Sequence, residues 1–355
     1  MLELIARPAD MTPEWMTQAL RSAGVLGDGR VSALDFDFIG TGKIGDNARF
    51  ALRYEGDAEG APATVVGKFA AEDETARTMA GAQGAYYNEV MFYRHLASRT
   101  TIRIPVIYAS VISEARDEFI LLMQDLAPAE PGSQLVGASL GQTRLVLAEA
   151  AKLAAAFYGD DSVANLDFVM SPTRNGGGAL AQQYLQQCWP AFLQRFGSSL
   201  TEEARAFGRR YVNAHLHFAT RHPGPRTLVH GDLRIENMLF SGDKCWTVDW
   251  QTPQEGSPVT DFTYFLGSSV DVEQRRQWER ELLREYNNQL SSLGVELGFD
   301  ECWAQYREQS MHGLLLTILG ASFTSPGERS DQMFRTVIQR QLQHCLDLDA
   351  GEFLP

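Results

Sequence analysis

The feature that most constrains the fold is a change in hydrophobic periodicity near residues 126–132. Before this point, short stretches read as strands: VSALDFDFIG, NARFALRYEG, ATVVGKFA, IPVIYASVI and EFILLMQDLA. One internal segment, YYNEVMFYRHLA, carries apolar residues at helical spacing. Beyond the Pro- and Gly-containing LAPAEPGSQLVG, the helical period continues to the C-terminus. We therefore predict an α+β chain, with a five-stranded antiparallel domain over residues 1–126 and a larger, mainly helical domain over residues 127–355.

A short helix is expected ahead of the first strand, over about residues 12–24. The segment MTPEWMTQALRSAG has Thr12 as N-cap, Pro13 in the first helical position and Gly24 at the end. We predict no catalytic residue in this segment.

Charge and composition exclude several classes of protein. Lys and Arg total 31 against 45 Asp and Glu, so the net charge is -14 and a nucleic-acid partner is not expected. The four cysteines lie far apart, without the close pairs of zinc or redox sites. No apolar run approaches the roughly 20 residues of a membrane span, and the N-terminus lacks a signal-peptide pattern. We predict a cytoplasmic protein with free thiols, either monomeric or homodimeric.

A glycine-rich stretch, FIGTGKIGDNARF, places Gly40, Gly42 and Gly45 in G-x-G-x-x-G spacing. In a dinucleotide-binding fold the third glycine opens a helix. Residues 47–54 instead alternate like a strand, so the glycines belong to a hairpin. This context favours a loop whose backbone N–H groups cover nucleotide phosphates, as in kinases. A plain flexible hairpin remains the structural alternative.

A lysine on the third strand is the expected partner of that loop. Lys68 lies in VVGKF, where apolar neighbours would hold its ammonium group inward, towards nucleotide phosphates. A buried ammonium group needs a counter-charge. Glu89, on the following helix, would anchor it, although a solvated surface acid is the alternative for Glu89 taken alone.

The densest set of polar residues occurs in LVHGDLRIENMLF and the following WTVDWQ. Asp232 is positioned to accept or orient a hydroxyl proton during phosphoryl transfer. Asn237 and Asp249 are oxygen donors of the kind that Mg²⁺ prefers. The apolar runs MLF and CWTV bracket a turn at SGDK, which predicts that Asp249 folds back alongside Asn237.

Three further polar residues have competing interpretations. Arg234 would place a cation against the γ-phosphate, or form a surface pair with Glu236. His230 is expected to be a hydrogen-bonded structural residue instead of a general base. Asp261 is explained by helix N-capping, with bracing of the catalytic loop through backbone N–H groups as the alternative.

The motifs HGDLRIEN, VDWQ and DFTYFLG together resemble the catalytic core of the aminoglycoside phosphotransferase and choline kinase superfamily. This superfamily shares the two-lobed protein kinase fold. The segments TPEWMTQAL, GTGKIGDNARF, NEVMFYRHLA, LLMQDLA and LVHGDLRIENMLF are most similar to bacterial members of its ecdysteroid-kinase-like branch. The resemblance covers nearly the whole chain, with the motifs in the family's order.

The resemblance implies a role for each matching residue. Asp232 would be the catalytic Asp, Asn237 and Asp249 the Mg²⁺ ligands, and Lys68 with Glu89 the phosphate-positioning pair. The segment MQDL would be the hinge, where adenine bonds main-chain groups of Gln124 and Leu126.

The expected activity is ATP- and Mg²⁺-dependent phosphorylation of a hydroxyl group on a small molecule. Eleven residues separate Asp249 from Asp261, which leaves little room for a peptide-docking segment. Residues of the helical domain favour an apolar acceptor where they are not core: Tyr184, Trp189, Phe192, Phe196, Trp303, Tyr306 and Met311. The net charge favours a cationic acceptor such as an aminoglycoside or choline. Because the acids of DVEQRRQWERELLRE alternate with arginines, as on a solvated helix face, we expect an apolar acceptor first and a cationic one as the alternative. Two other hypotheses are a non-catalytic nucleotide-binding module and a nicotinamide oxidoreductase.

Overall fold

The computed structural model describes residues 2–40, 45–221 and 224–355, and the chain forms two compact units. The first unit comprises Met1–Arg99, Ile104–Pro128 and Val248–Thr252. The second comprises Thr100–Arg103, Ala129–Thr247 and Pro253–Pro355. The short segment around Asp249 therefore belongs structurally to the first unit, although it follows most of the second in sequence.

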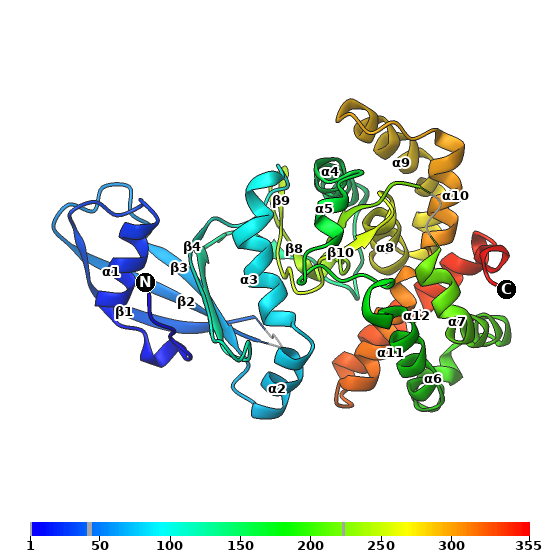
Figure 1. Cartoon of the computed structure of the whole chain (residues 1–355), viewed down its shortest axis with the longest axis horizontal. Coiled ribbons are helices and arrows are strands. Elements are labelled where there is room, and N and C mark those ends of the chain that lie inside the picture. Colours follow the sequence, from blue (N-terminus) through cyan, green and yellow to red (C-terminus); the bar gives the residue numbers. More distant parts are fainter. Residues whose placement is uncertain (1, 41–44, 222–223) are drawn as a thin grey trace. The chain divides into compact units, whose positions relative to one another are not determined.

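The first unit is built on the predicted five-stranded antiparallel sheet (Figure 1), with strand order β1-β2-β3-β5-β4. Its strands are β1 Arg30–Ile39, β2 Gly45–Glu55, β3 Thr64–Ala70, β4 Ile107–Ile112 and β5 Phe119–Gln124. The predicted N-terminal helix is α1, Pro13–Ser22, and the Thr12 side chain caps it by accepting a hydrogen bond from the Trp15 amide at 3.1 Å.

The two faces of this sheet pack against different helices, because side chains alternate along each strand. Val65 and Phe69 belong to the core shared with α1. Val66 and Ala70 point to the opposite core, which includes Tyr86 and Val90 of α3, Ala85–His95. Lys68 has the same parity as Val66 and Ala70, so it projects on the α3 side. A further helix, α2 (Glu74–Ala82), precedes α3 where the sequence predicted a single one.

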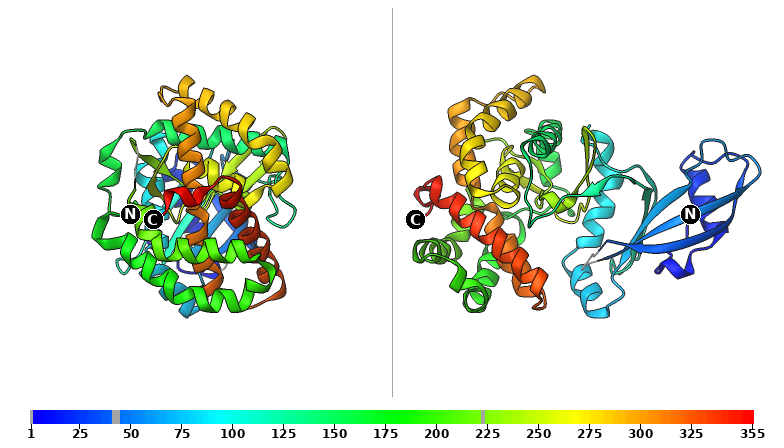
Figure 2. Two further views of the ribbon diagram at one scale, coloured as in Figure 1. Left: turned by 90° about the vertical axis from the view of Figure 1, so that its right-hand side faces the viewer. Right: turned by 180° about the vertical axis from the view of Figure 1, so that it is seen from behind.

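The second unit is mainly helical, as predicted. Its principal helices are α4 Leu140–Ala156, α5 Asp161–Ala164, α6 Gly177–Phe196, α7 Glu202–Thr220, α8 Thr260–Ser269, α9 Val272–Ser292, α10 Phe299–Gln309, α11 His312–Phe323 and α12 Glu328–Asp347. Short strands frame the loop that carries Asp232: β6 Glu130–Pro131, β7 Thr227–Val229, β8 Met238–Ser241, β9 Lys244–Thr247 and β10 Gln254–Gly256. Helix α6 packs on α7, and α11 packs on α6 and α12 (Figure 2).

Most aromatic residues considered for an acceptor site lie in the core of the second unit. The buried ones are Trp189, Phe192, Phe196 and Tyr306, together with Met311. Tyr184 is exposed and Trp303 is partly buried. The helical spacing of these aromatic residues therefore reflects their packing in the core more than the binding of a ligand.

The cysteines are unpaired, with Cys188 partly exposed and the other three buried. Within residues 2–40, 45–221 and 224–355, no helix combines the length and the apolar character needed to cross a membrane.

Candidate functional site

The glycine-rich stretch connects two long antiparallel strands, in which Ile39 lies opposite Asn47. Gly40 ends the first strand with φ +75°, a conformation that side chains other than glycine's rarely adopt, and Gly45 begins the second. Gly42 lies outside the described residues. The hairpin context expected for a phosphate-covering loop is present, and no β-α-β unit follows Gly45.

The segment proposed as a hinge follows directly from β5. The backbone N–H of Gln124 donates to the Val106 carbonyl at 2.8 Å. Asp125 accepts two hydrogen bonds from Arg49, at 2.8 and 3.1 Å, and one from the Ala127 amide at 3.1 Å. These bonds fix the backbone of residues 124–127, which includes Leu126.

Lys68 and Glu89 are in contact inside the first unit. The Lys68 Nζ lies 2.7 and 2.9 Å from the two carboxylate oxygens of Glu89, and 2.8 Å from Asp249 Oδ1. The Glu89 side chain is 1 % exposed, and the Lys68 side chain is 10 % exposed. The solvated-surface alternative for Glu89 is therefore wrong, because the carboxylate lies in the core as the counter-charge of a lysine.

The electrostatics of this cluster keep the lysine charged. Burial alone would lower the pKa of Lys68, but the charges of Asp249 and Glu89 outweigh burial and raise that pKa above its ordinary value. Burial raises the pKa of Glu89, and the charge of Lys68 opposes that rise. At neutral pH the cluster therefore presents an ammonium group held in a fixed direction.

Asp249 is held in an unusual backbone conformation. Its φ is +69°, a region that a non-glycine residue occupies at a cost unless its surroundings enforce it. The next residue, Trp250, stacks on Phe92 of α3 with ring centroids 3.6 Å apart, and Asn88 Nδ2 donates to the Gln251 carbonyl at 3.1 Å. Together with Lys68, these contacts from α3 and β3 direct the Asp249 carboxylate, whose side chain is 35 % exposed.

The loop that carries Asp232 lies in the second unit, and the side chain of Asp261 holds its backbone in place. The two Asp261 oxygens accept hydrogen bonds from the backbone amides of His230, at 2.7 Å, and Gly231, at 3.1 Å. The N-cap of α8 is Val259, so the N-capping prediction for Asp261 is wrong and the bracing alternative is correct. Gly231 has φ +84°, which lets the loop turn sharply before Asp232.

The Asp232 carboxylate accepts hydrogen bonds from three side chains. Oδ1 accepts from the Tyr264 hydroxyl at 2.7 Å. Oδ2 accepts from Asn237 Nδ2 at 3.1 Å and from Arg234 Nε at 3.3 Å. A quarter of the Asp232 side chain stays exposed, so the carboxylate is oriented and remains accessible.

Arg234 and His230 both act on this loop. Arg234 forms ion pairs with both Glu236 and Asp232, so the predicted pair with Glu236 is present. Arg234 is only partly exposed, so this pair does not lie on the open surface. His230 is fully buried, and its Nδ1 accepts a hydrogen bond from the Asp232 amide at 3.3 Å. This supports a structural role for His230.

Asn237 has an orientation that suits a metal ligand. Its Nδ2 donates to the Asp232 carbonyl at 2.9 Å as well as to Oδ2, so the amide oxygen faces the other way. Asn237 directly precedes the β8–β9 hairpin, where Met238 pairs with Thr247, and Asp249 follows the same hairpin by two residues. Across the described residues no group of three His, Cys, Asp or Glu side chains could hold a metal ion by itself. A Mg²⁺ ion that keeps waters and phosphate oxygens needs only one or two protein ligands.

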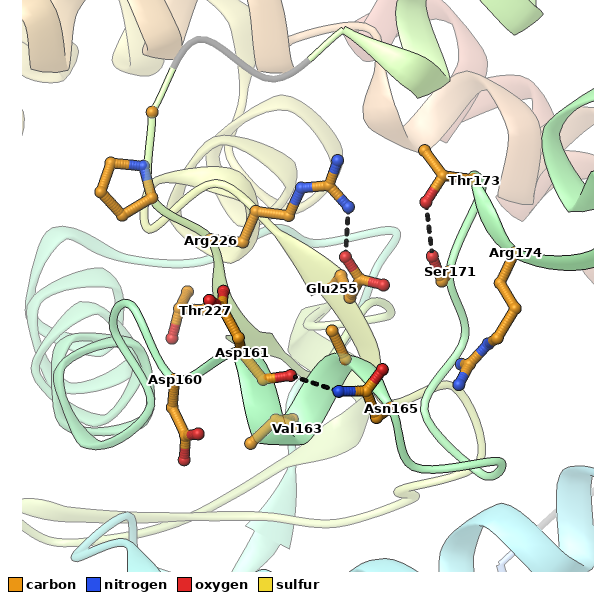
Figure 3. Close-up of a pocket in the computed structure, with 13 residues that line it drawn as sticks. Asp160, Asp161, Val163, Asn165, Ser171, Thr173, Arg174, Arg226, Thr227 and Glu255 are labelled. Carbon is orange, nitrogen blue, oxygen red and sulfur yellow. Dashed lines mark hydrogen bonds and ion pairs between the residues drawn. The ribbon is translucent and has the colours of Figure 1, made fainter.

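A separate cavity of about 470 Å³ lies in the second unit, beside the start of β7 (Figure 3). Asp160, Asp161, Arg174, Arg226 and Glu255 line it. Arg226 pairs with Glu255, and Arg174 donates to the Leu166 carbonyl at 2.7 Å. None of the predicted site residues lines this cavity, and its charges are of both signs.

Sequence reasoning missed several residues that shape the site. Tyr264 and Phe92 sit in apolar helical runs, where an aromatic residue reads as core. Asn88 begins the motif NEVMFYRHLA, but nothing in that motif indicates the Gln251 carbonyl as its partner. Hydrogen bonding of Asp232 to a buried tyrosine had no local signature, because the two residues are 32 positions apart.

Comparison with known proteins identifies the family of this chain. The profile of the ecdysteroid kinase-like family matches residues 46–299. A short stretch of 81 residues is 36% identical to the uncharacterized oxidoreductase dhs-27 of Caenorhabditis elegans, covering 20% of this chain and 10% of that protein. The chain thus spans about a tenth of the length of that relative.

Solved structures with the same fold include aminoglycoside phosphotransferases. The gentamicin complex of APH(2″)-IIa is 15% identical over 98% of this chain and 99% of its own, with a TM-score of 0.52. The GDP complex of a mutant aminoglycoside 2′-phosphotransferase-IIIa is 11% identical over 96% of this chain and 98% of its own, also at 0.52. At such identities the likeness shows the fold, and it confirms the predicted α+β, protein-kinase-like class.

Proposed function

Because this chain belongs to the ecdysteroid kinase-like family, we propose that it is an ATP- and Mg²⁺-dependent kinase that phosphorylates a hydroxyl group of a small, mainly apolar molecule. The observation that carries this proposal is the hydrogen-bonding of Asp232. A carboxylate aimed by Tyr264, Asn237 and Arg234, on a loop braced by Asp261, has the form of a base that receives a hydroxyl proton.

Each of the other residues has a role in this scheme. Lys68, held by Glu89, would contact nucleotide phosphates, and the backbone of Gly40, Gly42 and Gly45 would cover them. Main-chain groups of Gln124 and Leu126 would bond the adenine.

We assign Asn237 and Asp249 as the Mg²⁺ ligands. Both offer oxygen atoms, and the positive φ of Asp249 is the kind of backbone strain that is kept at functional positions. When bound, Mg²⁺ would neutralise phosphate charge that develops during transfer. Lys68 would then exchange its contact with Asp249 for one with the phosphates.

Arg234 would stabilise charge on the γ-phosphate, because its guanidinium lies beside Asp232. Burial would lower its pKa, but the carboxylates of Asp232 and Glu236 more than offset burial and raise the pKa, so the cation persists.

The apolar character of the acceptor is supported by helix α11. His312, at its first position, contacts the Gly231 carbonyl through Nε2 at 2.9 Å. Leu316, Leu319 and Phe323 follow at four, seven and eleven residues, on the same helix face. Leu316 and Leu319 are partly buried, Leu319 against the core of the second unit, and Phe323 is 53% exposed. An apolar stripe roughly 16 Å long therefore starts at the Asp232 loop.

A panel of hydroxylated compounds tests this function. Wild-type protein with ATP and Mg²⁺ is mixed with apolar alcohols, with aminoglycosides and with choline, and acceptor-dependent ADP release is measured. We expect turnover with members of the apolar group. Leu316→Ser should raise the KM for such an acceptor about tenfold, and Leu293→Ser, at an exposed position after α9, is the matched control. Turnover confined to cationic acceptors would contradict the apolar assignment, and no turnover with any group would favour a non-catalytic module.

A further inference from the structure

We infer that Tyr264 is a positioning residue, whose hydroxyl aims Asp232 Oδ1 at the acceptor hydroxyl and makes that oxygen the atom that receives the proton. This inference rests on the proposed kinase function. It names one oxygen of Asp232 and one helix as the parts that set the geometry of the base.

The hydrogen bonds at Asp232 identify the oxygen. An ionised carboxylate has about four lone-pair sites, two on each oxygen. Asn237 and Arg234 both donate to Oδ2, whereas Tyr264 donates to Oδ1. The described donors therefore leave one site, on Oδ1. The 2.7 Å bond from Tyr264 occupies the other site of Oδ1 and so fixes the direction of the one that remains.

Helix α8 holds both the backbone and the side chain of the catalytic residue. Asp261 and Tyr264 are three positions apart and hence on one face of the helix. Asp261 binds the amides of His230 and Gly231, and Tyr264 binds the carboxylate of Asp232, the next residue of the same loop. Any shift of α8 would move the loop and the proton acceptor together.

The tyrosine ring is confined from the other side by the start of α11. His312 packs edge-on against it, with ring centroids 5.6 Å apart. Gly313 follows, and a Cβ atom at that position would come within 2.3 Å of Gln341 Nε2 and within 2.7 Å of two Tyr264 ring carbons. The glycine thus creates the space in which the ring reaches Asp232.

The Tyr264 hydroxyl stays protonated at neutral pH. Burial raises the pKa of Tyr264 well above its ordinary value, and the neighbouring charge of Asp232 raises it further. Tyr264 therefore donates to Asp232 and does not itself act as a base.

In the reaction, the acceptor oxygen forms a bond to the γ-phosphorus of ATP while its hydroxyl proton passes to Asp232 Oδ1. The bond from the γ-phosphorus to the oxygen shared with the β-phosphate breaks, and ADP leaves with that electron pair. Without the Tyr264 hydroxyl the carboxylate loses one of three constraints, so fewer bound complexes have the proton acceptor in line.

The test is the kinetics of Tyr264→Phe, with ADP release measured for an acceptor from the panel, or for water as acceptor if the panel yields none. We expect kcat to fall about 10- to 100-fold, as for loss of one hydrogen bond to a charged group. The KM of the acceptor and the affinity for ATP should change by less than about twofold. Tyr286→Phe is the matched control, because its buried hydroxyl donates to the Pro258 carbonyl at 2.6 Å, away from Asp232.

A kcat of Tyr264→Phe within twofold of wild type would overturn the inference. Gly313→Ala tests the inference while leaving the Tyr264 hydroxyl in place. This variant should lower kcat. Adding Gly313→Ala to Tyr264→Phe should lower kcat little further than Tyr264→Phe alone. Should Tyr264→Phe fail to fold, a normal kcat in folded Gly313→Ala would overturn the inference equally. A failure of the proposed kinase function is distinguishable from a failure of this inference, because Asp232→Ala would then release ADP at the same rate as wild type.

Discussion

The replacement of Asp261 by Asn isolates the interaction that holds the loop that carries Asp232. The side chain is 3% exposed, and each of its oxygens accepts one backbone N–H, from His230 at 2.7 Å and from Gly231 at 3.1 Å. Asn has nearly the same shape but only one acceptor oxygen. Asp261→Asn therefore keeps one hydrogen bond and turns an amide NH₂ group towards the other backbone N–H.

The expected cost follows from these two bonds. One charge-assisted hydrogen bond contributes about 1.5–3 kcal/mol, and an unpaired buried N–H costs about 1–3 kcal/mol. Burying a neutral amide in place of a carboxylate relieves part of this cost, because burial disfavours the charged form and raises the pKa of Asp261. We expect the free energy of unfolding to fall by about 2–4 kcal/mol.

Urea unfolding of wild type and variant measures this difference, and kcat should fall with it because the loop loses a support. Asp271→Asn is the matched control. Asp271 also accepts two backbone N–H groups, from Glu273 at 3.0 Å and Gln274 at 3.5 Å, but as the exposed N-cap of α9. Asn is an equally good N-cap, so this variant should lose less than about 0.5 kcal/mol. Equal losses in the two variants would refute the bracing role of Asp261.

Two further predictions concern other buried ionisable residues. Lys68→Met removes the counter-charge of Glu89, so ATP should bind at least tenfold more weakly and the free energy of unfolding should fall by about 3 kcal/mol. Lys244→Met, at an exposed position, is the control. An unchanged ATP affinity in Lys68→Met would exclude a contact between Lys68 and the phosphates. His215 is buried, and burial lowers its pKa to about 4, from 6.5. Between about pH 6.5 and pH 4, His215 is therefore protonated in the unfolded chain and neutral in the folded chain. The free energy of unfolding should fall as pH drops from 6.5 towards 4, by about 3 kcal/mol at most. Unfolding of His215→Gln at both pH values should show a smaller fall, and an equal fall in both proteins would contradict the assignment.

The sequence predicted those parts of the structure that depend on local pattern. Strand alternation defined the five-stranded sheet, and Thr12 with Pro13 marked the start of α1. Lys68 was placed correctly on an inward face because a charged residue amid apolar strand neighbours has few other solutions, and its need for a counter-charge pointed to Glu89.

The parts that the sequence did not predict depend on contacts between distant segments. Asp261 stands at a helix start, where N-capping is the local explanation, and its true partners lie 30 and 31 residues earlier. Tyr264 reads as a core aromatic residue, since nothing in DFTYFLG indicates an acceptor for its hydroxyl. The stretch ETARTMAGAQG combines helix formers with glycines and few apolar residues, so α2 gave no strong periodic signal.

The most direct test of the account is single-turnover transfer from ATP labelled in its γ-phosphate. With Mg²⁺ and an acceptor, wild-type protein should move the label to the acceptor, and Asp232→Ala should bind ATP with unchanged affinity yet leave the label on ATP or transfer it at least 100-fold more slowly. Transfer by Asp232→Ala at the wild-type rate would contradict the assignment of Asp232 as the residue that receives the proton.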